Sequence, residues 1–257
     1  MPALASKIAL VTGGSRGIGR SIAQRLAAEG ALLIIHYGNS VEGARRTLAD
    51  IEAAGGRGFI VQADLDRPAE SITPMFERID RELTQRTGAT SIDIVVNNAG
   101  NLVPGPIETM GFADFDRAIV MGAKSPFFVT QAALKRLRDG GRVINISSNT
   151  TRAVHPEVIA YAMAKGALDV FSKTLAQHLG RRRITVNSVL PGPTATEEFL
   201  KMAESNPGFL EHAKSQSALG RLGTPCDIAD IVAFLASDQS GWITGQLIDA
   251  TGGTLLG

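Results

Sequence analysis

The sequence has a single cysteine, Cys226, and four histidines that are scattered along the chain. One cysteine cannot form a disulfide within the chain, and it makes no cluster with the histidines. No apolar run approaches the ~18 residues of a membrane-spanning helix, and the amino-terminal stretch MPALASKIAL lacks the apolar core of a secretion signal. We therefore expect a soluble, cytoplasmic protein that binds no metal.

An excess of charge of either sign is also lacking. The chain has 26 basic and 25 acidic residues, so its net charge of +1 creates no large field that would attract nucleic acid or an anionic membrane. No linker or low-complexity stretch divides the 257 residues. We predict one domain over residues 1–257 that binds neither nucleic acid nor membrane.

Apolar runs alternate with amphipathic segments along the chain. Ile8 to Val11 predicts a strand, a helix follows from about Gly17 to Glu29, and Leu32 to His36 predicts a second strand. Strand, helix and strand of these lengths make a unit with two parallel strands and a right-handed crossover. The same pattern predicts further strands at 57–64, 92–100, 141–148, 184–190 and 246–250. It predicts further helices at 41–54, 67–86, 112–137 and 158–179, helical segments within 197–217, and a helix that begins near Thr224-Pro225. The expected fold is α/β and doubly wound, with a seven-stranded, mostly or wholly parallel sheet between helices.

The turn after the first strand is rich in glycine. Gly13, Gly17 and Gly19 allow the backbone to bend and to approach a pyrophosphate, while the following helix offers free N–H groups to the anion. Many such turns need glycine for shape alone. The position between a strand and a helix nevertheless favours a dinucleotide site.

Three side chains between residues 148 and 165 are suited to proton chemistry. Tyr161 and Lys165 are four residues apart in a helical segment, so they share one face, and an ammonium group beside a phenol is expected to lower the phenol's pKa. Ser148 ends a predicted strand, where ligand crevices form. The ordinary alternative is a half-buried tyrosine, a solvated lysine and a turn-forming serine.

Five segments in order resemble the short-chain dehydrogenase/reductase family. They are TGGSRGIG at 12–19, Asp64-Leu65, NNAG at 97–100, the set Ser148, Tyr161 and Lys165, and PGPT at 191–194. The resemblance implies a Rossmann-type fold and hydride transfer between a nicotinamide and a carbonyl or secondary alcohol, with Tyr161 as general acid/base. It is closest to 3-oxoacyl-carrier-protein reductases and general ketone or aldehyde reductases.

The resemblance also assigns roles to single residues. Ser148, Tyr161 and Lys165 are predicted to be catalytic, and Ser148, Asn149 and Tyr161 to bind substrate. The predicted cofactor contacts are Gly13, Ser15, Arg16, Gly17, Ile18, Gly19, Tyr37, Asn39, Ser40, Asp64, Leu65, Asn98, Ala99, Gly100, Tyr161, Lys165, Pro191, Gly192, Thr194 and Thr196. Asp64 is otherwise a routine helix cap, and Asn98 is as well explained by an architectural role. Helical segments at about 194–217 are expected to cover a small carbonyl or alcohol, and the family implies a homotetramer.

The end of the second strand bears on the choice of cofactor. An enzyme that uses NAD normally has an acidic residue there for the ribose 2′-hydroxyl, and that residue would repel a 2′-phosphate. Tyr37 stands in this place, and no carboxylate follows until Glu42. Arg16, Asn39 and Ser40 can meet a phosphate, so NADP(H) is favoured over NAD(H).

One position departs from the family pattern. Family members usually have an asparagine that anchors a water before the Pro-Phe stretch, and this chain has Gly122. Either the helix bends at Gly122 and freed backbone carbonyls bind that water, or the proton relay is impaired. The second reading leaves open a slow or non-catalytic dinucleotide-binding regulatory protein.

Overall fold

A single parallel sheet forms the centre of the molecule. The computed structural model describes residues 2–204, 207–254 and 256. Its strands are β1 (Ile8–Val11), β2 (Leu32–Tyr37), β3 (Arg57–Gln62), β4 (Ile92–Asn97), β5 (Leu137–Ile146), β6 (Thr185–Pro191) and β7 (Leu247–Ala250). They lie in the order β3-β2-β1-β4-β5-β6-β7, and every neighbouring pair is parallel. The predicted fold class is confirmed.

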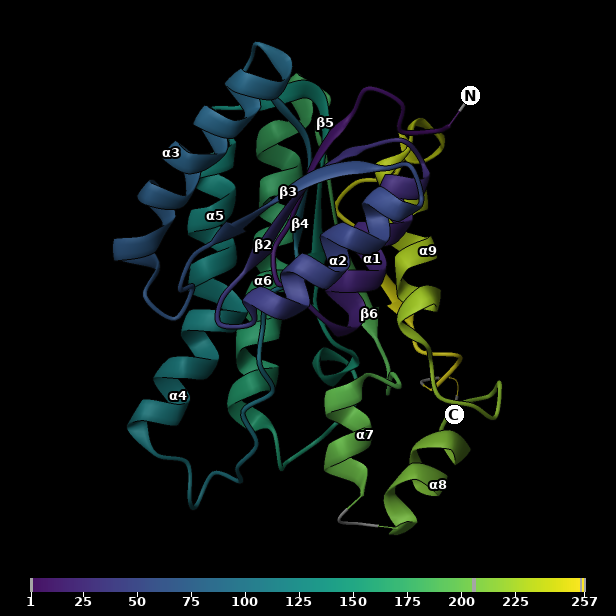
Figure 1. Cartoon of the computed structure of the whole chain (residues 1–257). Coiled ribbons are helices and arrows are strands. Elements are labelled where there is room, and N and C mark those ends of the chain that lie inside the picture. Colours follow the sequence, from purple (N-terminus) through teal and green to yellow (C-terminus); the bar gives the residue numbers. More distant parts are fainter. Residues whose placement is uncertain (1, 205–206, 255, 257) are drawn as a thin grey trace.

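Helices cover both faces of this sheet (Figure 1). One face packs against α3 (Pro68–Thr87), α5 (Ser125–Ala133) and α6 (Ile159–Leu179), which contribute Phe76, Val129 and Leu175 to its core. The other face packs against α1 (Gly17–Ala28), α2 (Val41–Ala53) and α9 (Pro225–Ala236). Because both faces are covered, β1, β2 and β4 are buried along their whole length, which explains their continuous apolar sequences.

The sheet has a topological switch between β1 and β4. From β1 the chain adds β2 and β3 on one side, and then returns to add β4 on the other side. The connections after β1 and β4 therefore diverge and leave a crevice at the carboxyl ends of these strands, which is where open α/β sheets bind ligands. The segments predicted to bind the cofactor follow these strands.

The predicted long helix from Phe112 to Leu137 is wrong in two respects. It is divided into α4 (Phe112–Ile119), a π-helical turn (Val120–Lys124) and α5, and it ends before Leu137. Leu137 begins β5 and pairs with Ile92, because extending the strand buries Leu137 against the core. The π-turn contains Gly122, where a bent helix was one of the two alternatives.

Two short helices lie in the predicted covering segment, α7 (Glu197–Ala203) and α8 (Pro207–Ser215). The helical segments predicted between 197 and 217 are therefore found, and residues 205 and 206 lie outside the described residues. The helix predicted to begin near Thr224-Pro225 is confirmed as α9, and a reciprocal bond between Thr224 and Asp227 caps it. Among the described helices, none is long and apolar enough to cross a membrane.

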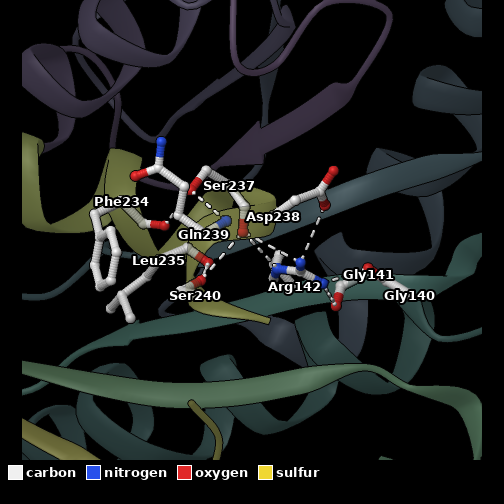
Figure 2. A network of polar contacts seen from close by, with 9 residues as sticks. All are labelled: Gly140, Gly141, Arg142, Phe234, Leu235, Ser237, Asp238, Gln239 and Ser240. Atoms are coloured by element: carbon white, nitrogen blue, oxygen red, sulfur yellow. Dashed lines mark hydrogen bonds and ion pairs between the residues drawn. The ribbon is translucent and has the colours of Figure 1, made fainter. Parts of the chain in front are cut away.

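A buried arginine connects β5 to the end of α9 (Figure 2). Arg142 is 6% exposed, and its guanidinium donates to the backbone carbonyls of Gly140, Gly141 and Ser237. It also pairs with Asp238, at 3.3 Å. Burial lowers the pKa of Arg142, although Asp238 opposes this effect. The arginine thus joins β5, an inner strand of the sheet, to the corner that follows α9.

Candidate active site

Ser148, Tyr161 and Lys165 come together at the carboxyl edge of the sheet. Ser148 follows β5 and begins a short 3₁₀ turn, where its Oγ accepts hydrogen bonds from the Thr150 backbone N–H and hydroxyl. Tyr161 and Lys165 lie in the first two turns of α6. The Tyr161 hydroxyl lies near enough to the Ser148 side chain for Ser148 to lower the tyrosine's pKa. The three predicted catalytic residues therefore form one cluster.

Lys165 is anchored by the strand that carries Ser148. Its side chain is 4% exposed, and Nζ donates a hydrogen bond to the Ile146 carbonyl at 2.8 Å. A Cβ atom placed on Gly100 would lie 3.6 Å from Nζ, so the amine is beside the loop that follows β4. Burial lowers the pKa of Lys165 to about 8, while the charge of Asp169 raises it. An ammonium has three donors, and the carbonyl uses one of them.

The expected effect of Lys165 on Tyr161 is wrong for this structure. Loss of solvation raises the pKa of Tyr161 above its ordinary value, and the hydrogen bond with Ser148 only partly opposes this. Lys165 Nζ lies over the tyrosine ring, 5.6 Å from its centre, and so contacts the ring face rather than the hydroxyl. A phenol with a raised pKa is neutral at pH 7, which suits it to donate a proton rather than to accept one.

The glycine turn has the conformation that its residues predict. Gly13 and Gly17 have φ of 67° and 53°, in the left-handed region that other residues rarely adopt. Gly19 is constrained by space instead, because a Cβ atom there would lie 2.2 Å from the Gly13 carbonyl oxygen. The amino terminus of α1 follows directly, and Arg16 occupies its cap position without capping it by a side-chain bond. Backbone N–H groups at this end of α1 can therefore meet an anion.

Residues that the sequence analysis missed hold this turn in place. The Thr12 hydroxyl accepts bonds from the backbone N–H groups of Asn98 and Ala99. His36 accepts from the Gly13 N–H through Nδ1, and its Nε2 contacts the Ala63 carbonyl, so the ring is neutral with the proton on Nε2. Burial lowers the pKa of His36 to about 4. A lone histidine at the end of an apolar strand was the only available signal.

Three of the predicted cofactor residues have evident structural roles. The Asn98 side chain donates to the Thr12 and Gly13 carbonyls, as the architectural alternative predicted. Asp64 accepts a bond from the Asp66 N–H, and Leu65 is buried, with its carbonyl accepting from Ser125. Each still lies after a strand at the carboxyl edge of the sheet.

The end of β2 presents no carboxylate to the crevice. Tyr37 is 7% exposed, Asn39 is exposed, and the Ser40 hydroxyl oxygen caps α2 by accepting from Gly43. Arg16 forms an exposed ion pair with Glu198 at 3.3 Å. Because exposed pairs of this kind contribute little energy, Arg16 is available to an anion that replaces Glu198.

The loop after β6 reaches the glycine turn. Pro191 ends β6. Gly192 packs tightly against Thr251, since a Cβ atom on Gly192 would lie 3.0 Å from the Cα of Thr251. Thr194 is buried and donates to the Gly192 carbonyl. Thr196 caps α7, and its side chain is 3.4 Å from the position of a Cβ on Gly17. The structure therefore brings Thr196 next to the turn that is predicted to hold phosphate.

Gly122 has a steric reason to be glycine. A Cβ atom at this position would lie 2.6 Å from the Cβ of Ala164 on α6, far closer than such atoms approach. The π-turn and α6 can pack this closely only because Gly122 lacks a side chain. An asparagine here would require either helix to move. Asn149, the remaining predicted substrate contact, is 7% exposed and lies just after Ser148.

The described residues contain no group of three or more histidine, cysteine, aspartate or glutamate side chains placed to hold a metal ion.

A family model described as enoyl-(acyl carrier protein) reductase matches residues 13–254. The chain belongs to the short-chain dehydrogenase/reductase family. It is an oxidoreductase of that family.

Curated and solved relatives agree with this assignment. Versicolorin reductase of Emericella nidulans is 36% identical, over 97% of this chain and 96% of its own. The angucycline C-6 ketoreductase LanV with bound NADP is 47% identical and superposes with a TM-score of 0.95, over 99% of this chain and 98% of its own. LanV with bound NADP and rabelomycin is 46% identical with a TM-score of 0.91, over the same shares.

Proposed function

We propose that this short-chain dehydrogenase/reductase is an NADPH-dependent ketoreductase that reduces a carbonyl group of a multi-ring aromatic ketone. The observation that carries the proposal is the cluster of Ser148, Tyr161 and Lys165 beside the loop that follows β4, a loop that in turn contacts the glycine turn at Gly13. Proton chemistry and a dinucleotide cradle thus meet at one edge of the sheet.

Each residue of the cluster has a distinct role. The Ser148 hydroxyl holds the carbonyl oxygen of the substrate, and Tyr161 gives its proton to that oxygen as negative charge develops on it. The raised pKa of Tyr161 keeps the phenol protonated until then. Lys165 presents its two remaining N–H donors to the ribose hydroxyls of the cofactor. NADPH, when bound, supplies the hydride.

The residues present fit NADP(H) better than NAD(H). No acidic side chain stands at the end of β2 to repel a 2′-phosphate, and Arg16, Asn39 and Ser40 lie at the rim of this position. The two LanV structures contain NADP, which supports the same choice. Replacing Glu198 by a phosphate as the partner of Arg16 would give that cation a doubly charged partner.

The substrate class rests on relatives and on the covering helices. LanV was crystallised with rabelomycin, and the LugOII reductase, at 46% identity, is described as catalysing keto-reduction at C1. In this chain the rings of Phe199 on α7 and Phe209 on α8 are 5.4 Å apart, and Leu200 is 40% exposed. An apolar cover of this kind suits a flat, hydrophobic ketone.

The homotetramer is part of the proposal. Large apolar side chains remain exposed on α5 and α6, namely Phe127, Phe128, Met163 and Val170. Solvent-facing groups of this kind on adjacent helices are typical of an interface with another copy. Native mass spectrometry should show four chains, and charged substitutions at Phe128 and Val170 should reduce that number.

The assay that tests the function is NADPH oxidation with a panel of aromatic and aliphatic ketones. We expect Tyr161→Phe to lower turnover by at least about 100-fold while NADPH affinity, measured by fluorescence, changes less than about twofold. Ser148→Ala should also lose activity. Ser147→Ala is its matched control, because the buried Ser147 hydroxyl has no partner among the described residues. Full activity of Tyr161→Phe would refute the role.

A non-catalytic or slow regulatory protein is the second candidate, and Gly122 is the observation that favours it. The close packing of Gly122 on Ala164 gives the glycine a structural explanation, which weakens that reading. The same assay decides the matter, since a regulatory protein would bind NADPH tightly and oxidise it with none of the ketones.

A further inference from the structure

Asp169 is a buried carboxylate that the proposed reaction does not use. It is 5% exposed, and neither of its oxygens has a hydrogen-bond partner among the described residues. Burying an unpaired carboxylate is costly, so a protein that keeps one gains something from its charge. Asp169 therefore requires an explanation beyond packing.

The position of Asp169 on α6 points to Lys165. Lys165, Asp169 and Ser172 follow one another at spacings of four and three residues, so they form a polar row on the buried face of an otherwise apolar helix. Lys165 and Asp169 do not form a direct ion pair, yet the carboxylate charge acts on the amine. They are neighbours one helical turn apart.

The other elements around this row supply neutral groups. From β5 and β6, Asn145 and Ser188 bond with Ser172, and Tyr161 precedes Lys165 on α6. Other elements pack against the outer side of α6, and their charged side chains reach solvent. These side chains are Lys124 of the π-turn, Asp114, Asp116 and Arg117 of α4, and Arg181 and Arg182 after α6. Asp169 is thus the buried counter-charge available to Lys165 in the described part of the chain.

We propose that Asp169 is a positioning residue that acts as the counter-charge of the Lys165 ammonium and holds it ready for the cofactor ribose. Burial works against the charged amine and Asp169 opposes that effect, and the two together leave the pKa of Lys165 at about 8. Without Asp169, Lys165 would lose its proton nearer neutral pH and offer the ribose one N–H fewer. The role of Lys165 in this inference rests on the proposed function.

The experiment compares the wild-type protein with Asp169→Asn, which keeps the shape and removes the charge. Competitive labelling of Lys165 by acetic anhydride, followed by mass spectrometry from pH 6 to 10, reports protonation without any substrate. NADPH affinity is measured by fluorescence at the same pH values. The matched control is Glu77→Gln, which removes an exposed charge from α3. Asp169→Ser replaces the asparagine variant should the latter fail to fold.

In Asp169→Asn we expect the labelling midpoint of Lys165 to move down by about one pH unit. NADPH affinity should remain within about twofold of wild type at pH 6.5 and fall about tenfold near pH 8.5. An unchanged midpoint would overturn the proposal, as would an equal loss of affinity at every pH. If the midpoint moves but no ketone is reduced by the wild type, the proposed function fails and the counter-charge assignment stands.

Discussion

Arg142 and Lys165 are both buried cations, but their surroundings differ. The Arg142 guanidinium donates to three carbonyl groups and pairs with Asp238, so its donors are directed at protein atoms (Figure 2). Lys165 donates to one carbonyl and lies near a carboxylate that bonds to no described group. A buried charge with its bonds filled is an anchor, whereas one with bonds to spare is held ready for a ligand.

The largest effect is expected when the anchor is removed. Arg142→Met should lower the free energy of unfolding by about 3 kcal/mol, because it leaves buried carbonyl groups without donors. Urea denaturation measures the loss. Turnover per folded molecule should be unchanged, since none of the groups that Arg142 bonds belongs to the candidate site. A loss of turnover without a loss of stability would break the comparison.

His36 sharpens the comparison as a buried base with both nitrogens bonded. The folded protein leaves it neutral down to about pH 4, while the unfolded chain binds a proton below about pH 6.5. Stability from His36 is therefore present above pH 6.5 and is lost as the pH falls towards 4. We expect about 2 kcal/mol to be lost between pH 7 and pH 5, measured by urea denaturation.

The control for this pH dependence is His36→Asn. The variant should be less stable at pH 7 because the bond to Gly13 is weakened, but its stability should fall less between pH 7 and pH 5. Parallel pH curves for wild type and variant would mean that His36 does not titrate in this way.

The functional pair should behave in the opposite sense to the anchor. The double variant Lys165→Met/Asp169→Leu removes both charges together, so we expect the free energy of unfolding at pH 7 to rise by about 1 kcal/mol. Ketone reduction should be lost. A clear fall in the free energy of unfolding would show that the two charges stabilise the fold, as Arg142 is expected to do, and that they are not held for a ligand.

The smallest effect is expected at the rim of the site. Arg16→Glu should weaken NADPH binding by about tenfold or more and NADH binding by less than about threefold, because it places a carboxylate where a 2′-phosphate is expected. Arg78→Glu, the same change on the far face of the sheet, is the control. Equal losses for the two cofactors would argue against the NADP(H) assignment.

The sequence predicted the segments that form the strands and the segments that form the candidate site, because glycine turns, apolar runs and the Tyr161 to Lys165 spacing act locally. It did not predict the length of β5, since Leu137 extends the strand only by pairing with Ile92 far away in sequence. The direction of the Tyr161 pKa shift was also missed. It depends on how many protein atoms surround the phenol, which helix spacing does not show.

Local chemistry in the chain was thus enough to predict the parallel sheet, the glycine turn and the three side chains that come together in the candidate site. Only the tertiary structure decided why residue 122 is glycine, why His36 stays neutral and how deeply Lys165 and Asp169 are buried. These depend on distances between segments that are remote in sequence, such as the 2.6 Å that a Cβ on Gly122 would leave to Ala164. Packing sets such distances, and with them the charge that each buried group can carry.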